Sequence, residues 1–200
     1  MTGAGRPRTP ADPAAPEAAA RALEEALLGL EVTYESPQPG AYLVRLPGQH
    51  KLATMAWLIA GAHSLHVEAF FCRQPDENHA EFYRFLLERN ARTYGVHFAL
   101  DETGDVYLVG RLPLAAISPE EIDRLLGCVL SYADETFDQA LMLGFASAIR
   151  KEYAWRVKRG ESLANLQAFG TLTGADGQRP VPRLADADSG DATADAEDES

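Results

Sequence analysis

The segment ISPEEIDRLLGCVLSYADETFDQALMLGF, residues 117–145, decides the fold. It opens with a helix start signal, because Ser118 can cap the helix, Pro119 fits its first position and Glu121 completes a capping box. Apolar residues then recur every three to four positions as far as about residue 158. This spacing predicts a long amphipathic helical region at the C-terminal end of the domain.

The length of this region argues against one straight helix. About 40 residues at 1.5 Å per residue would span roughly 60 Å, which exceeds the size of a domain of this length. We therefore expect two helices or one bent helix. Asp134 could cap a second helix, and Gly144 is a weaker candidate for the break.

The residues before this region alternate between two patterns. Apolar residues at every second position predict strands, and apolar residues three or four apart predict helices. Turns rich in Gly and Pro separate them. The expected elements are a helix at 17–30, strands at 42–46, 51–60 and 64–73, a helix at 77–93, and strands at 96–101 and 105–112.

The resulting order is αβββαββα(α). It lacks the βαβ alternation and the glycine-rich turns of a nucleotide-binding doubly wound fold. We expect an α+β domain with an antiparallel sheet and helices on one face. The strand at 51–60 is apolar on both sides, so the other face needs water, a partner or a second copy.

Both ends of the chain differ from the middle in composition. Residues 1–15 are rich in Pro, Ala and Gly, and residues 170–200 hold few large apolar side chains, so both are expected to be disordered tails around a domain at 16–169. Residues 184–200 hold seven acids and no base. The whole chain has a net charge of −12, and without these seven acids the remainder has a net charge of −5. A mildly acidic domain of this kind disfavours a broad nucleic-acid surface.

Composition also limits the cellular location. No stretch approaches the roughly 18 to 20 apolar residues of a membrane span, and the first residues lack the apolar region of a signal peptide. We expect a cytoplasmic protein that does not enter membranes. Cys72 and Cys128 lie far apart in apolar stretches and are expected to be buried free thiols.

A metal site would need three or four converging ligands. His66, Glu68 and Cys72 share one face of the predicted strand, whereas His63 lies on the other face or in the turn, and His50 could approach from a neighbouring strand. Surface histidines are the simpler interpretation, so no metal site is predicted.

No catalytic or cofactor-binding residues are predicted either. There is no GxSxG elbow and no glycine-rich phosphate loop. Two carboxylate clusters could in principle do acid–base chemistry, but each sits where acids usually cap a helix or a turn. These clusters are Asp134, Glu135 and Asp138, and Asp101, Glu102 and Asp105.

One basic patch interrupts the mildly acidic chain, in IRKEYAWRVKR at 149–159. Cations favour a helix C-terminus, so a solvated helix end is one interpretation and an interaction surface is the other. A single helix end is too small for nucleic acid. The residues of this patch are Arg150, Lys151, Tyr153, Trp155, Arg156, Lys158 and Arg159.

The element order, the segment at 117–145 and the segment IRKEYAWRVKRGESLANLQAF at 149–169 resemble the YbjN-type family of bacterial proteins, in particular its actinobacterial members. The resemblance covers about residues 17–169. It implies a fold like that of type III secretion chaperones, small proteins that usually dimerise and hold a partner chain. The family is often labelled a sensory transduction regulator, and it offers no agreed catalytic residues to carry over.

The sequence thus predicts a non-catalytic, chaperone-like or regulatory domain that binds a protein partner through a dimeric sheet and helix surface. The alternative is a small-molecule sensor or an enzyme with a pocket between the sheet and the long C-terminal helix. A flat apolar patch favours the first, and a deep pocket lined by polar groups favours the second.

Overall fold

The computed structural model describes residues 15–173. The chain divides into two compact units, the first ending at Ala146 and the second beginning at Ser147. The expected tails fall almost entirely on residues 1–14 and 174–200, which lie outside the described residues. Residues 170–173, which were expected to belong to the C-terminal tail, form the short helix α5.

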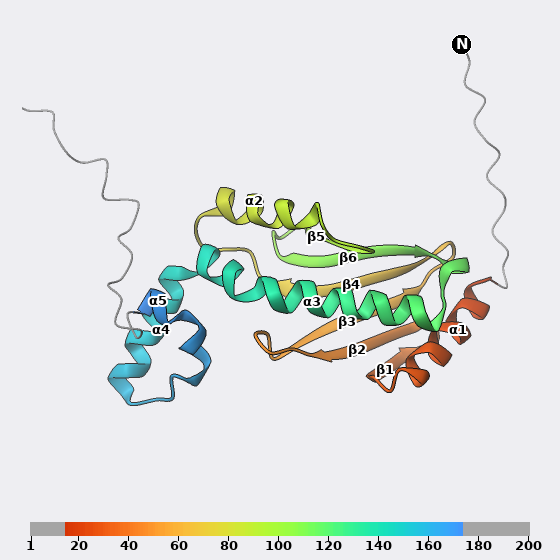
Figure 1. Ribbon diagram of the computed structural model, residues 1–200, viewed down its shortest axis with the longest axis horizontal. Helices are drawn as coiled ribbons and strands as arrows, with labels where there is room; N and C mark the ends of the chain where they lie inside the picture. Colours follow the sequence, from red (N-terminus) through yellow and green to blue (C-terminus); the bar gives the residue numbers. More distant parts are fainter. Residues whose placement is uncertain (1–14, 174–200) are drawn as a thin grey trace, which may run out of the picture. The chain divides into compact units, whose positions relative to one another are not determined.

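The first unit is built on one six-stranded, fully antiparallel sheet (Figure 1). Its strand order is β1-β2-β3-β4-β6-β5, so the two hairpin-connected groups meet where β4 pairs with β6. The strands are β1 (Thr33–Gln38), β2 (Ala41–Pro47), β3 (Ala53–Ala60), β4 (Ser64–Cys72), β5 (Val96–Leu100) and β6 (Val106–Pro113).

Three helices pack against one face of this sheet (Figure 1). They are α1 (Ala15–Gly29), α2 (His79–Asn90) and α3 (Pro119–Gly144), and a single 3-10 turn, η1 (Leu114–Ala116), leads into α3. The α+β class, the antiparallel sheet and the order of elements are therefore as predicted, with one strand added. None of the described helices is both long and apolar enough to span a membrane.

The core lies between the sheet and these helices. One row of side chains crosses the sheet from Val44 through Ala56, Ala69 and Leu108 to Phe98, each residue paired with the next across neighbouring strands. All five are buried, because period-two alternation sends them to the helix side. The opposite side chains of the same strands face away from the helices.

The added strand β1 was missed because it contains Pro37 within TYESPQ. Proline has no N–H to give to a ladder, so it is confined to edge strands and bulges. Here β1 is the edge strand, and its register with β2 shifts between Glu35 and Gln38. The residues at 37–40 still turn the chain, with Gly40 at a φ of 79°.

The start of α3 confirms the capping signal, since the Ser118 hydroxyl accepts the backbone N–H of Glu121 at 3.2 Å. The helix then runs unbroken past Asp134, which does not cap a second helix as had been suggested. The break is at Gly144, whose carbonyl accepts the backbone N–H groups of Asp76 and Glu77 at 2.9 and 3.2 Å. The loop before α2 thus fixes the end of α3.

The second unit contains α4 (Ala146–Arg159), which begins in the last residue of the first unit, followed by η2 (Ala164–Phe169) and α5 (Gly170–Thr173). The helix α4 ends at Arg159 and is followed by Gly160, which has a φ of 67°. A glycine relieves the steric cost of that left-handed conformation. The two expected helices are therefore α3 and α4.

Candidate functional site

The side chains of the sheet that point away from the helices form what we call the open face. Its centre is one row across four strands, Trp57 beside Glu68, then Val109 and His97. The apolar members of the open face are Leu43, Met55, Trp57, Ile59, Phe70, Tyr107 and Val109, and its polar members are Arg45, His66, Glu68, His97 and Arg111.

The open face is unusually apolar for a surface. Met55, Ile59 and Phe70 are 38%, 40% and 43% exposed, and Trp57 is half-buried. Four strands about 4.8 Å apart, with same-side residues roughly 6.6 Å apart, give a surface of about 400 Å², within which Glu68, His66 and His97 lie among the apolar side chains. A contiguous apolar patch of a few hundred Å² with charged residues around it is typical of an interaction surface.

The polar side chains of this face lack hydrogen-bond and ion-pair partners within the described part of the chain. Glu68, Arg111, His66 and His97 make no hydrogen bond or ion pair among residues 15–173. Glu68 is flanked in its row by Trp57 and Val109, so its nearest cross-strand neighbours are apolar. These groups are available to a molecule that covers the face.

Phe70 is held in place at one end of the open face. Its ring meets the Tyr107 ring edge-on, with the ring centroids 5.4 Å apart. The ammonium of Lys51 lies 5.6 Å from the Phe70 centroid, and it is also within 6 Å of the Phe71 and Phe137 rings. A cation beside an aromatic ring is attracted by the ring quadrupole, so Lys51 fixes the ring on the surface.

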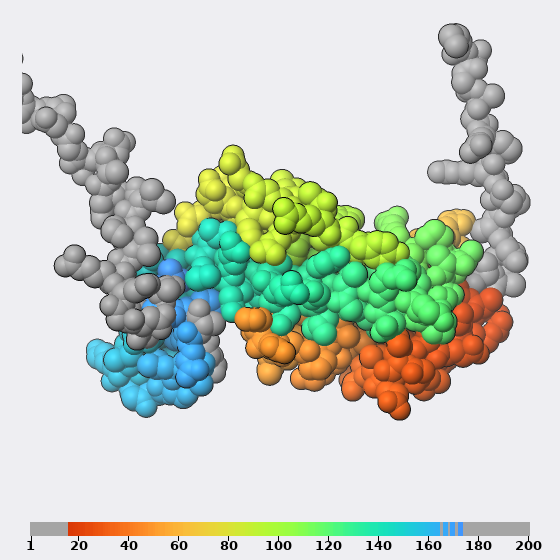
Figure 2. Space-filling model, viewed as in Figure 1, coloured from red at the N-terminus to blue at the C-terminus, as the bar shows by residue number. Residues whose placement is uncertain are grey.

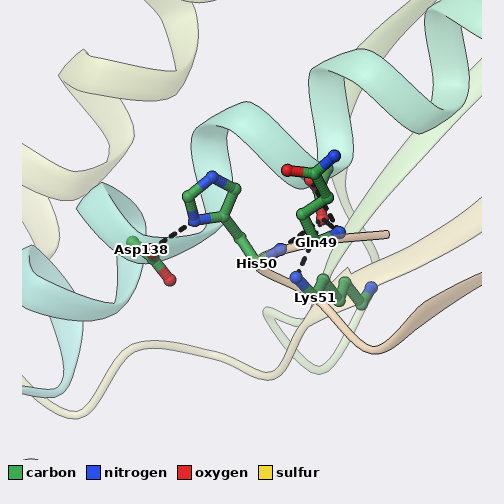
Figure 3. A network of polar contacts seen from close by, with 5 residues as sticks. Gln49, His50, Lys51 and Asp138 are labelled. Atoms are coloured by element: carbon green, nitrogen blue, oxygen red, sulfur yellow. Dashed lines mark hydrogen bonds and ion pairs between the residues drawn. The ribbon is translucent and has the colours of Figure 1, made fainter. Parts of the chain in front are cut away.

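The turn that carries Lys51 is bound to α3 by two carboxylates, and Figure 3 shows one of them, Asp138, beside His50. Asp134 accepts the backbone N–H groups of Gln49, His50 and Lys51, at distances between 2.9 and 3.1 Å. One helical turn later, Asp138 contacts Nδ1 of His50 at 2.6 Å. We call these five residues the turn clamp. It fixes the β2–β3 hairpin against the helix layer.

The contacts of the turn clamp change the ionisation of two groups. Burial opposes ionisation of Asp134, but the three N–H donors outweigh it and hold the pKa of its carboxyl below the ordinary value. For His50, the hydrogen bond with Asp138 and the charge of that carboxylate raise the pKa of the imidazole. The turn clamp is therefore a structural device that relies on an ionised Asp134.

Lys51 bridges the turn clamp and strand β4. Its ammonium donates to the carbonyls of Phe70 and Phe71, at 2.5 and 3.0 Å. Two consecutive carbonyls can accept from one donor here because the β4–β6 register shifts between Phe70 and Cys72, which is a β-bulge. Burial lowers the pKa of Lys51 to about 8.

The prediction that His66, Glu68 and Cys72 share one face of the strand is wrong because of this bulge. The extra residue turns Cys72 into the core, where it is 6% exposed, while His66 and Glu68 remain on the open face. Burial raises the pKa of the Cys72 thiol to about 12. Among residues 15–173, no three His, Cys, Asp or Glu side chains are grouped to hold a metal ion.

The second carboxylate cluster organises a turn. Asp101 accepts the backbone N–H groups of Thr103 and Asp105, both at 2.9 Å, and closes the hairpin between β5 and β6 at Gly104. Asp105 accepts the N–H of Gln74 at 2.8 Å. These acids hold loops, as the sequence predicted for this cluster, whereas the role of Asp134 was not predicted.

Both edges of the sheet are obstructed. At β5, the side-chain amide of Asn90 donates to the carbonyl of Phe98 at 3.0 Å and accepts its N–H at 2.7 Å, as a neighbouring strand would. At β1, Pro37 and the register shift interrupt the other edge. An incoming strand therefore finds no continuous row of donors and acceptors, which leaves the face as the accessible part of the sheet.

The basic patch lies in the second unit, on α4. Its members are not equivalent, because Arg156 is engaged by Glu152 at 2.6 Å and by the carbonyl of Ser162 at 2.9 Å. Tyr153 and Arg150 are partly buried. The exposed members are Lys151, Trp155, Lys158 and Arg159, with Arg159 stacked 4.8 Å from the Trp155 ring centroid.

Comparison with known proteins assigns the family. Residues 19–142 match the family model of YbjN, described as "Putative bacterial sensory transduction regulator". This chain belongs to the YbjN family. The match confirms the resemblance inferred from the sequence.

The relatives of this YbjN protein include uncharacterized mycobacterial proteins. One from Mycobacterium leprae is 51% identical over 160 residues, which cover 78% of this chain and 87% of that protein. One from Mycobacterium tuberculosis is 50% identical over 157 residues, which cover 76% of this chain and 86% of that protein. Mycobacteria are actinobacteria, which agrees with the expected branch of the family.

Two solved structures are similar to parts of this YbjN chain. The crystal structure of the ExsC–ExsE complex gives a TM-score of 0.43 at 20% identity, covering 58% of this chain and 89% of that chain. The structure of the HopA1–SchA chaperone–effector complex gives a TM-score of 0.42 at 14% identity, covering 56% of this chain and 88% of that chain.

Proposed function

We propose that this YbjN protein is a non-catalytic, regulatory interaction module that binds protein through the open face of its sheet. The observation that carries the proposal is the apolar patch around Trp57, Met55 and Phe70, which no described helix covers. A hollow of about 1130 Å³ lies on this face, with His66, Glu68, His97 and Arg111 in its lining, and it is larger than most small-molecule sites, which favours a partner of protein size. Glu68 and Arg111, which have no hydrogen-bond or ion-pair partner among the described residues, give the patch a means of selecting its partner.

Because both edges of the sheet are obstructed, we expect a protein partner to bind the open face and not to add a strand at an edge. Asn90 already occupies the position that an added strand would take beside Phe98. The proposal that the protein is non-catalytic is supported by the carboxylates that could have acted as acids or bases. The carboxylates of Asp134 and Asp101 accept hydrogen bonds from backbone N–H groups. These bonds favour the ionised carboxylate, so neither side chain is placed to give or take a proton in a reaction.

We further propose that the resting occupant of the open face is a second copy of the chain. A two-fold interface requires a self-complementary surface, and this face carries the acid Glu68 together with the bases Arg45 and Arg111. A surface of about 400 Å² supplies about half of the roughly 800 Å² per partner of a stable interface.

The test of this proposal is a charge placed at the centre of the face. Light scattering across a concentration series should give twice the monomer mass for the wild type and the monomer mass for Trp57→Asp, because a buried unpaired carboxylate opposes association. The matched control is Leu28→Asp, which changes a 62% exposed leucine on α1 and should leave the dimer intact.

Two results would contradict the proposal. A wild-type protein that remains monomeric at high micromolar concentration rules out the homodimer. A Trp57→Asp variant that still dimerises places the contact elsewhere and removes the open face from the interface. Circular dichroism of both variants verifies that each remains folded.

The basic patch suggests an additional contact within the chain. Residues 184–200, which lie outside the described residues, carry seven acids and no base, and we expect them to contact the exposed bases Lys151, Lys158 and Arg159 at low salt. Each exposed pair contributes roughly 0 to 1 kcal/mol and is screened by salt, so the contact is weak.

Backbone amide NMR shifts of residues 149–159 test this expectation. The full-length protein and a chain ending at Leu184 should differ at low salt and agree at high salt. Identical shifts at low salt would show that residues beyond 184 do not contact the patch.

A further inference from the structure

A groove of about 490 Å³ runs between α2 and α3, away from the open face. The two helices lie along each other in Figure 2, and each lines the groove with residues one turn apart. The helix α2 contributes Glu88 and Arg89, the turn after it contributes Arg92, and α3 contributes Glu135 and Gln139. Two bases and two acids therefore line one concave surface, and their charges sum to zero.

One of these bases is held in a fixed position. The Arg89 guanidinium donates to Oε1 of Gln139 across the groove at 3.1 Å. It also stacks on Phe85, 4.9 Å from the ring centroid. The remaining N–H groups of Arg89 stay available, and a fixed guanidinium fork is the group that best receives a carboxylate in two hydrogen bonds.

The other charged groups have capacity left for a ligand. Glu88 lies in the last turn of α2 and Arg92 just beyond the end of the helix, and neither side chain forms a hydrogen bond or ion pair among residues 15–173. On α3, Glu135 uses Oε1 to accept the Ser131 hydroxyl at 2.6 Å, while its Oε2 accepts no hydrogen bond from the part of the chain that the structure describes.

The rest of the lining is aromatic or small. Phe85 and Tyr132 line the groove together with the buried Phe98 and Thr136. The Tyr132 hydroxyl is fixed because it accepts the backbone N–H of Tyr94 at 3.0 Å. A volume within the range of roughly 300 to 1,000 Å³ fits a small molecule, whereas a protein segment needs a longer surface.

We propose that this groove binds a small zwitterion with a carboxylate and a primary ammonium, that is, a free α-amino acid. The carboxylate of the ligand pairs with Arg89 and Arg92, its ammonium pairs with Glu88 and Glu135, and its side chain lies against the rings. A simple anion such as phosphate is disfavoured, because the two glutamates repel it at the same site. This site is separate from the open face and does not depend on the proposed function.

Isothermal titration of the full-length protein with each of the twenty L-amino acids tests the proposal. At least one should bind with a Kd of about 1 mM or tighter. Its N-acetyl derivative, which lacks the ammonium, and its methyl ester, which lacks the carboxylate, should each bind about tenfold more weakly or not at all. Inorganic phosphate should not compete.

Variants identify the groove as the site. Arg92→Gln and Glu135→Gln should each weaken binding about tenfold, and Arg84→Gln, an exposed change on the helix α2 outside the groove, should leave the affinity unchanged. Thermal unfolding should confirm that all three variants fold like the wild type.

Each other outcome overturns the proposal. Binding of none of the amino acids removes the site, and equal binding of the N-acetyl derivative removes the role of the glutamates. Unchanged affinity in Arg92→Gln places the ligand elsewhere. The oligomeric state measured in the same samples reports on the open face separately, so failure of one proposal does not decide the other.

Discussion

Replacement of Asp134 by Ala is expected to lower the free energy of unfolding by about 2 kcal/mol relative to Asp123→Ala. Asp134 accepts three consecutive backbone N–H groups at the β2–β3 turn, and the part-buried N–H of Lys51 loses its acceptor when the carboxylate is removed. Asp123 is an exposed acid on the same helix, so the two substitutions change helix propensity equally. Chemical denaturation of both variants measures the difference.

The same contact predicts a dependence on pH. The pKa of Asp134 is lower in the folded chain than in the unfolded chain, so its contribution is complete above the ordinary value of about 3.9. It is lost as the pH falls through the folded pKa. The wild type should therefore converge on the Asp134→Ala variant in acid. A constant gap between the two down to pH 2 would contradict the turn clamp.

Two glycine-to-alanine substitutions in α3 are expected to have opposite signs. A Cβ at Gly144 would lie 2.7 Å from Cβ of Pro75 and 2.8 Å from Cδ2 of Phe82, and both neighbours are buried. Overpacking of this kind costs about 1 to 3 kcal/mol, which exceeds the gain of about 1 kcal/mol in helix propensity. Gly144→Ala should therefore destabilise the protein.

Gly127→Ala is the matched change in the same helix. A Cβ at Gly127 meets no atom within 4 Å, so only the propensity gain remains and the variant should be stabilised by up to about 1 kcal/mol. Thermal or denaturant unfolding of the pair decides the matter. Stabilisation of both variants would mean that Pro75 and Phe82 can move, and that the end of α3 is less tightly enclosed than its contacts indicate.

The elements that were predicted correctly carry local signals. Ser118 and Pro119 mark the start of α3 within four residues of sequence, and Gly104, with a φ of 87°, marks the β5–β6 turn. The apolar pattern of β3 on both sides also indicated a face without a helix layer, and the structure exposes Met55 and Ile59 on that face. These features follow from periodicity and turn chemistry.

The features that were missed depend on residues far apart in sequence. Asp134 was interpreted as a helix cap because its partners, 83 to 85 residues away, leave no local trace. The bulge in β4 that turns Cys72 inward likewise depends on its pairing with β6. The groove between α2 and α3 leaves little local signal, because charged residues four apart in sequence, such as Glu88 and Arg92, occur at the solvated ends of many helices.

The Asn90 side chain affects how readily the protein can aggregate at high concentration. A sheet whose last strand is exposed can recruit further strands without limit, which is the route to fibrils. The Asn90 amide satisfies both backbone groups of Phe98, so a recruited strand would first have to displace it. Two copies of the chain can then associate through their open faces as a closed dimer, whereas the addition of further strands at the β5 edge is suppressed. We expect the protein to tolerate crowding without forming fibrils.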